Sequence, residues 1–292
     1  MKAKLMNFKN LIDKDIRQKF EDSPLFWSVE SDIQFWLAHR IHDKLGEEWA
    51  TAEVAGFENR STYNISYKEF LDDTIAEKSE GKEIKRVITE VTFADKKENS
   101  DRRKFDLGVL NQGSVKVVLN NGTKNYREQD FDALFELKFV KNDHYYQLLN
   151  GENGKNNDHD KMTTFWDKME DKDESDIKKA VERIIADHSE SIEDDKSGWR
   201  DDYNLLKDVY KLEKKDNIDN RAIILLSNYD IFYDRDETSK KHLTKNKSNR
   251  ERVNRIVGKK LHNFIEKKAK ERGIDLYYFT PEYNNLKNLK QS

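Results

Sequence analysis

The sequence predicts an α/β fold in which a central mixed β-sheet is flanked by helices. Three observations lead to this prediction. Apolar residues recur at helical spacing over 8–45, short segments rich in β-branched residues follow over 87–140, and helical and strand-like segments alternate after residue 200. Strands that alternate with helices are typical of a sheet that helices cover on both faces.

The composition indicates one large globular domain. Charged residues make up 38% of the 292 positions and hydrophobic residues 35%, so the surface must be densely charged. Aromatic residues, at 11%, supply bulky groups for a core. We expect a single domain over 1–292, with an N-terminal helical extension over 1–27 and a polar helical insertion or cap over 141–200.

Several classes of protein are excluded by what the sequence lacks. Without cysteine, the chain has neither disulfide bonds nor thiolate zinc sites. It has no run of about 18 apolar residues, and residues 1–10 lack an apolar signal core, so we expect a cytoplasmic protein with no membrane span. Gly-rich phosphate-binding loops and a Gly-x-Ser-x-Gly elbow are also missing, which argues against kinases, dehydrogenases and serine hydrolases.

The first part of the chain is predicted to be helical. Over residues 8–20 the apolar residues at helical spacing are Phe8, Leu11, Ile12, Ile16 and Phe20. Over residues 31–45 the corresponding stripe consists of Ile33, Trp36, Leu37, Ile41 and Leu45. Gly46 is expected to end this second helix, and a further short helix is expected over 67–78.

The middle and C-terminal parts are predicted to mix strands with helices. Strands are expected over 87–93, 104–110, 114–119, 133–140, 222–227 and 274–279, and helices over 177–185, 203–214 and 248–272. Asn120-Asn121-Gly122 is a turn signal after the third strand. The segment 222–227 is almost entirely apolar, which is typical of a strand buried on both faces.

Three charged residues on the predicted strands carry the chemistry: Asp106, Glu136 and Lys138. Alternate residues of a strand project from one face, so Glu136 and Lys138 share a face. Two charges within an apolar strand are costly unless they are paired or serve in a functional site. If strand 104–110 lies beside strand 133–140, Asp106 joins them. Mg²⁺ binds one or two carboxylates with water, and a lysine can orient the attacking water or neutralise charge, so the trio suits phosphodiester hydrolysis.

With Phe105-Asp106 on one strand and Glu136-Leu137-Lys138 on the next, the chain resembles the PD-(D/E)XK nuclease superfamily, which includes many restriction endonucleases and Holliday-junction resolvases. Phe105 stands where the motif has proline, a position that often varies, and the interval between the two motif strands is long. The resemblance covers the order of elements from about Ser28 to Phe279, with 141–200 as an extra piece.

The resemblance implies a restriction-endonuclease-like core and cleavage of DNA. It implies that Asp106 and Glu136 hold Mg²⁺ or Mn²⁺ and that Lys138 assists the attacking water. Members often add an acidic residue on the first core helix, and Glu30 is the candidate, either as a ligand of a second metal or as a charge at the helix N-terminus. Glu90, on the first predicted strand, is interpreted as a solvent-facing residue.

Charge is unevenly distributed along the chain. The net charge of −3 argues against wholesale coating of nucleic acid, but residues 240–272 hold 13 Lys and Arg against 3 Glu, and residues 152–202 hold 17 acids against 9 bases. The candidate phosphate contacts in the basic segment are Arg250, Arg252, Arg255, Lys259 and Lys260. A solvated helical face explains these five positions equally well.

Two other functions are compatible with the sequence. One is a nucleic-acid-binding module that keeps the fold without cutting, although the intact Asp, Glu and Lys argue against it. The other is a protein-interaction subunit whose acidic segment, 152–202, contacts a partner. A homodimer or another protein partner is compatible with each hypothesis, and roles in restriction, repair or defence against foreign DNA are all compatible with the nuclease.

Overall fold

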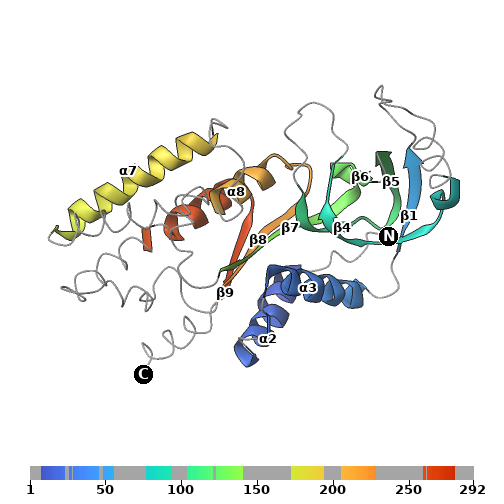
Figure 1. Ribbon diagram of the computed structural model, residues 1–292, viewed down its shortest axis with the longest axis horizontal. Coiled ribbons are helices and arrows are strands. Elements are labelled where there is room, and N and C mark those ends of the chain that lie inside the picture. The colour runs from blue at the N-terminus through green and yellow to red at the C-terminus, as the bar shows by residue number, and fades with distance from the viewer. Residues whose placement is uncertain are drawn as a thin grey trace. The chain divides into compact units, whose positions relative to one another are not determined.

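A computed structural model gives the structure of the chain, and it confirms an α/β protein with mixed sheets and flanking helices (Figure 1). The structure describes residues 8–23, 26–27, 29–45, 49–55, 77–93, 104–120, 123–140, 172–193, 205–227, 259–260 and 262–279. The chain forms two compact units. Unit 1 comprises Met1–Ile16, Trp27–Leu137 and Lys215–Ala222, and unit 2 comprises Arg17–Phe26, Lys138–Lys214 and Ile223–Ser292.

The described strands form two sheets. The first has the order β2-β1-β5-β6 and consists of β2 (Glu83–Lys85), β1 (Trp49–Ala55), β5 (Gly113–Asn120) and β6 (Thr123–Tyr126). The second has the order β3-β4-β7-β8-β9 and consists of β3 (Val87–Val91), β4 (Phe105–Leu110), β7 (Phe131–Val140), β8 (Asn220–Ser227) and β9 (Asp275–Phe279).

The four-stranded sheet contains three strands that the sequence analysis did not predict, β1, β2 and β6. Strand β1 pairs in parallel with β5 and antiparallel with β2, so the sheet is mixed. Small residues form the buried side of β1, where Ala50 is 0% and Ala52 is 2% exposed. The predicted turn after β5 is confirmed as a hairpin, because β5 and β6 pair antiparallel up to Asn120 and Thr123.

The five-stranded sheet contains the strands that carry the motif. Strands β3, β4 and β7 pair antiparallel in chain order, which confirms the predicted neighbourhood of the segments 104–110 and 133–140. The residues of β8 from Ala222 to Leu226 are all buried, as expected for a strand covered on both faces. The final strand was also predicted correctly, within one residue of β9.

The helices of unit 1 bury the apolar residues that the sequence predicted to lie on one face of each helix. The first helical segment comprises α1 (Phe8–Leu11) and the π-helical turn η1 (Ile12–Ile16), and the ring of Phe8 packs edge-on against Phe135 of β7. Helix α3 (Glu30–Leu45) packs against β3 and β4 (Figure 1). Its inward residues Ile33, Leu37 and Ile41 are each 0% exposed. Arg40 of α3 donates a hydrogen bond of 2.8 Å to Asp15 of η1 and joins the two helices.

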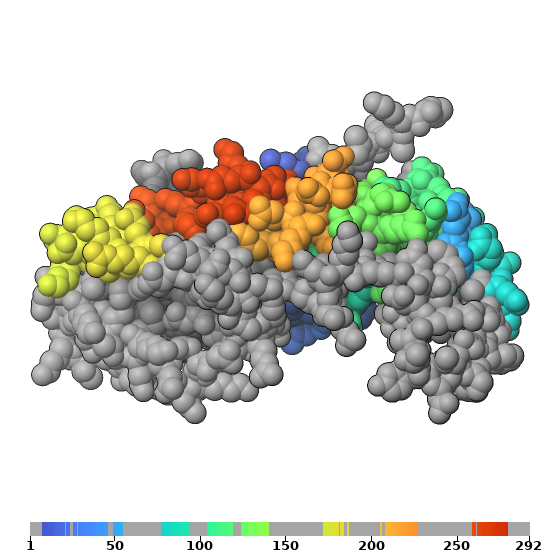
Figure 2. All heavy atoms as spheres, turned by 90° about the horizontal axis from the view of Figure 1, so that it is seen from above, coloured from blue at the N-terminus to red at the C-terminus, as the bar shows by residue number. Residues whose placement is uncertain are grey.

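Unit 2 contains α2 (Arg17–Asp22), α7 (Glu174–Glu193), α8 (Leu205–Glu213) and the helical residues 262–271. Helices α7 and α8 pack together, and Lys260 forms an ion pair with Glu182 of α7. Figure 2 shows α7 in yellow beside residues 259–279 in red. The predicted helices 177–185 and 203–214 are therefore confirmed. Of the predicted helix 248–272, the part before residue 259 lies outside the described residues.

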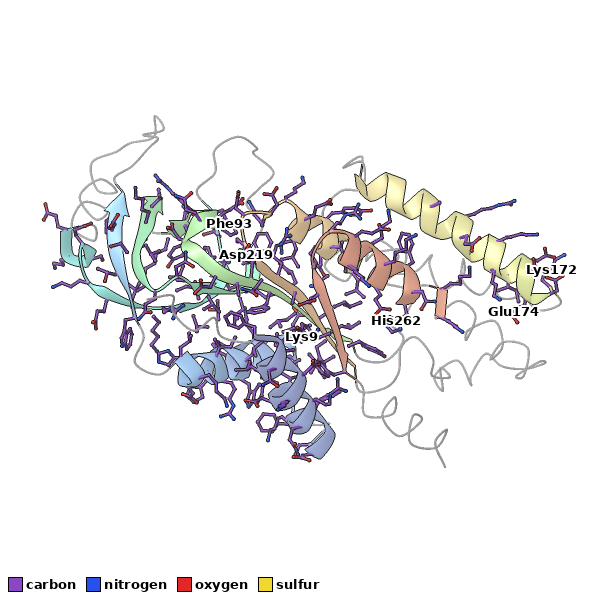
Figure 3. The ribbon with its side chains drawn as sticks, turned by 180° about the vertical axis from the view of Figure 1, so that it is seen from behind. Lys9, Phe93, Lys172, Glu174, Asp219 and His262 are labelled. Carbon is purple, nitrogen blue, oxygen red and sulfur yellow. The ribbon has the colours of Figure 1, made fainter. Side chains whose placement is uncertain are left out.

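His262 fixes the helix 262–271 against the last strand. Its ring packs edge-on against Tyr278 of β9, with 5.8 Å between centroids, and Figure 3 labels its position. Burial lowers the pKa of His262, and the nearby Glu266 opposes this shift. The turn after this helix contains Gly273, whose positive φ of 65° suits glycine. Within the described parts of the chain, no helix is both long and apolar enough to cross a membrane.

Gly108, in the middle of β4, is required by close packing. A Cβ atom at this position would lie 2.5 Å from Cε1 of Phe131 and 2.9 Å from Cγ2 of Val91. We therefore expect Gly108→Ala to lower the free energy of unfolding by about 1–3 kcal/mol. Urea denaturation measures this loss, with Ser114→Ala on the exposed side of β5 as the control. Equal midpoints for the two variants would contradict the packing argument.

Asp130 precedes β7 and is buried, at 7% exposed. Burial raises the pKa of Asp130 above its ordinary value, while backbone hydrogen bonds from Arg127 and Lys116 and the charges of those residues oppose the shift. A carboxyl with a raised pKa stabilises the fold most at low pH, and this contribution is lost as pH rises through the raised value.

The stability of the wild type relative to Asp130→Asn should therefore fall as pH rises from about 4, the ordinary value for aspartate. Chemical denaturation of both proteins across pH 3–7, in steps of about half a unit, tests the sign of this difference. The sign does not depend on how well asparagine replaces the hydrogen bonds. A difference that stays flat, or that grows in favour of the wild type, would show that burial does not dominate at Asp130.

Candidate functional site

Asp106 stands where the pairing between β4 and β7 stops. The register of the two strands runs as far as Leu107↔Phe135, so Asp106 and Glu136 are the next residues in opposite positions. Instead of continuing the ladder, the carboxylate Oδ2 of Asp106 accepts a hydrogen bond of 2.6 Å from the backbone N–H of Leu137. The side chain of Asp106 is thereby fixed against β7, beside Glu136.

Glu136 is almost completely buried, at 1% exposed, although it carries a carboxylate. An isolated buried carboxylate is costly, so such groups are usually paired or hold a metal. Asp106 is half-buried, and among the described residues its Oδ1 atom has no hydrogen-bond partner. The two carboxylates therefore combine one fixed oxygen with a further oxygen that can receive a ligand.

Two residues that the sequence analysis did not select complete this part of unit 1. Gln34 of α3 donates through its amide nitrogen to the backbone carbonyl of Asp106, at 2.5 Å, and to Oε1 of Glu90, at 3.4 Å. Glu90 of β3 lies opposite Asp106, between two paired positions of the register. The acidic residues Glu90, Asp106 and Glu136 thus stand in one row across three neighbouring strands.

Glu90 has an unusual backbone conformation. Its φ is 55°, the left-handed region, and among the described residues no other non-glycine residue has a positive φ. Such conformations cost about 1–3 kcal/mol and often occur at functional sites. The side chain is half exposed and lies 3.3 Å from the Lys104 ammonium. The solvent-facing interpretation of Glu90 is therefore correct for its carboxylate, but its backbone and its contact with Gln34 link it to Asp106.

Lys138, in unit 2, is buried as well, at 7% exposed. Its Nζ atom lies 3.6 Å from Oδ2 of Asp208, which α8 contributes. A buried lysine is expected to have a charge partner, and Asp208 is one. Sequence reasoning missed Asp208, although its position was informative. It lies three residues after Leu205 and four before Leu212, which puts a carboxylate in the buried stripe of α8.

Glu30 opens α3, one helical turn before Gln34. The α3 side chain that is hydrogen-bonded to Asp106 is that of Gln34. Within the described residues, no three or more His, Asp or Glu side chains gather closely enough to hold a metal ion. The structure therefore does not bring Glu30, Asp106 and Glu136 together as a three-carboxylate cluster. Glu30 lies in the first turn of α3, where an acidic group is favourable.

The predicted phosphate contacts are only partly described. Lys259 is exposed, whereas Lys260 forms an ion pair with Glu182 of α7. Arg250, Arg252 and Arg255 lie outside the described residues. The role of this segment in binding nucleic acid stays a prediction.

The oxygen ligands of the candidate site favour some metal ions over others. Asp106 and Glu136 offer carboxylate oxygens, which are hard ligands that suit Mg²⁺ or Mn²⁺. Mg²⁺ typically binds through one or two protein carboxylates and keeps several waters, so two carboxylates fit it without a third.

No family model, curated protein or solved structure compared with the chain matches it.

Proposed function

We propose that this chain is a metal-dependent nuclease that hydrolyses phosphodiester bonds of DNA at Asp106 and Glu136, with Lys138 assisting. The observation that carries the proposal is the end of the β4–β7 ladder, where the Asp106 carboxylate replaces a backbone partner and lies opposite a buried glutamate. A carboxylate that is buried or half-buried is costly unless it is paired or holds a cation, and two carboxylates at opposite positions of neighbouring strands suit a divalent cation.

The order of elements also supports the proposal. When the strands of the four-stranded sheet, the short η2 turn and α7 are left aside, α3 is followed by β3, β4 and β7, then by α8 and β8. This is the order that the resemblance to the PD-(D/E)XK nucleases implies. The finer assignment, a restriction-endonuclease-like core, is part of the proposal. It rests on this order together with the positions of Asp106 and Glu136 on adjacent strands.

The chemistry assigns a task to each residue. Mg²⁺ or Mn²⁺, when bound, lowers the pKa of a coordinated water and offsets negative charge on the phosphate. In hydrolysis the water oxygen bonds to phosphorus, the bond from phosphorus to the leaving oxygen breaks, and that oxygen takes up a proton. Asp106 and Glu136 would provide the carboxylate oxygens that hold the cation. The Lys138 ammonium would stabilise the developing negative charge or orient the attacking water.

A cleavage assay tests the proposal. The purified chain is incubated with linear, supercoiled, single-stranded and branched DNA, and with RNA, in Mg²⁺, in Mn²⁺ or in EDTA. We expect cutting of DNA that requires the metal and that Lys138→Ala lowers severely. Cutting by Lys138→Ala at the wild-type rate would point to another site or to a contaminant. Binding of DNA without cutting would support a non-cutting module, and neither activity would favour a protein partner.

A further inference from the structure

One charged partner of Lys138 comes from an element far from it in the sequence. Asp208 lies in the first turn of α8, 70 positions after Lys138 in the chain. The side chains of both residues are 9% exposed, and Nζ of Lys138 lies 3.6 Å from Oδ2 of Asp208. Helix α8 therefore delivers a carboxylate to the one basic residue of the motif.

Stability alone does not account for this ion pair. Asp208 interrupts an apolar face on which Leu205, Val209 and Leu212 are each 0% exposed. Replacing a buried ion pair with apolar residues of similar volume is often neutral or stabilising, because burying two charges costs about as much as their attraction returns. A carboxylate at position 208 is therefore better explained by what it does to Lys138.

A charged partner fixes the position of a lysine ammonium. The ammonium stands at the end of four rotatable bonds, so an unheld Nζ atom samples several positions. Lys138 follows Glu136 by two residues on β7, and alternate residues of a strand project from the same face. A charge that must stabilise a transition state acts best when it is already in place before the reaction.

On the basis of the proposed function, we propose that Asp208 is a positioning residue that holds the Lys138 ammonium in its reactive place. Asp208 acts through Lys138 and contacts neither the substrate nor the metal. Loss of its charge should therefore lower kcat and leave KM and DNA affinity unchanged. Outer groups that orient a reacting side chain typically contribute about 10-fold to 100-fold, and we expect a loss of kcat in that range.

The same helix offers a matched control. Glu213 at the end of α8 accepts a hydrogen bond of 2.7 Å from the Arg272 guanidinium and is half exposed. Glu213→Gln removes an ion pair from α8 without touching Lys138. Asp208→Asn removes the charge next to Lys138 with almost no change in size, and Asp208→Glu keeps the charge.

The experiment compares the full-length variants in the Mg²⁺-dependent cleavage assay, with circular dichroism melts of each protein. We expect Asp208→Asn to lose about 10-fold to 100-fold in kcat at unchanged KM, Asp208→Glu to recover part of it, and Glu213→Gln to match the wild type. Equal kcat for Asp208→Asn and the wild type would overturn the proposal. So would losses that follow the fraction unfolded in all three variants.

If Asp208→Asn alone does not fold, the double variant Lys138→Met/Asp208→Asn still tests the proposal. It removes the Lys138 ammonium together with the Asp208 carboxylate. Lys138→Met and Lys138→Met/Asp208→Asn should have the same residual activity if Asp208 acts only through Lys138. A further loss in the double variant would give Asp208 a role of its own and overturn the positioning argument. Failure of the wild type to cut any substrate would instead refute the proposed function.

Discussion

Asp106→Asn should reduce metal-dependent cleavage by about 10³-fold or more, a loss comparable to removal of a group that stabilises the transition state directly. The substitution keeps an oxygen that can accept the Leu137 N–H, so the local fold is preserved. It removes the negative charge that a hard divalent cation requires from its ligand. The effect should therefore appear in activity and in metal affinity, with little change in the melting temperature.

The measurement combines single-turnover cleavage at several Mg²⁺ concentrations with titration of Mn²⁺ binding. Glu53→Gln is the control, since Glu53 is an exposed carboxylate on β1 of the other sheet. We expect Asp106→Asn to weaken metal binding and to lose cleavage at every metal concentration tested, while Glu53→Gln behaves as the wild type. Full cleavage by Asp106→Asn would show that Asp106 does not belong to the active site. The resemblance to the nuclease motif, on which the proposal partly rests, would then lose its support.

The second large effect concerns the stability of unit 1. The Lys215 side chain is 4% exposed, and its Nζ atom lies 2.9 Å from Oε1 of Glu128 and 4.5 Å from the centre of the Phe93 ring. Phe93 is labelled in Figure 3. Asn217 also donates to Glu128, at 3.2 Å. Glu128 is thus a carboxylate that balances a buried ammonium.

Glu128→Ala should lower the free energy of unfolding by about 3–5 kcal/mol, because it leaves the Lys215 charge buried without its carboxylate. Urea denaturation at low temperature measures the loss. Glu174→Ala is the control, since Glu174 forms an exposed ion pair with Lys178 within α7, and exposed pairs contribute at most about 1 kcal/mol.

Adding Lys215→Met to Glu128→Ala should restore much of the loss, because both charges are then removed together. A double variant no more stable than Glu128→Ala would show that the cost arises from lost packing or from Asn217, and that the charge of Lys215 is not its cause. A loss of less than about 1 kcal/mol in Glu128→Ala would show that water reaches Lys215 and that the pair behaves as an exposed one.

Several elements were predictable because the local sequence contains a repeated physical signal. The stripe of Ile33, Leu37 and Ile41 predicted α3, and all three residues are fully buried. The apolar run from Ala222 predicted β8 in the same way. Glu136 and Lys138 could be selected because two charges in a core-like strand conflict with burial, and this conflict can be read from one strand alone.

Strands β1 and β2 could not be predicted in this way. Strand β1 is a short run of mostly small residues whose parallel partner β5 lies more than 50 residues further along the chain. Neither strand has enough local apolar alternation to indicate a sheet. Their stability comes from pairing, which depends on residues that the local window does not contain.

The sequence by itself determined which charged residues stand on strands of the sheet, namely Asp106, Glu136 and Lys138. It also determined the periodicity that makes their surroundings strand or helix. Only the tertiary structure decided which groups interact with those charges. The Leu137 amide donates to Asp106, and Asp208 lies beside Lys138. The physical reason is that burial preference is a property of each residue and its near neighbours. Contact partners depend on the pairing and packing of segments that the chain brings together from far apart.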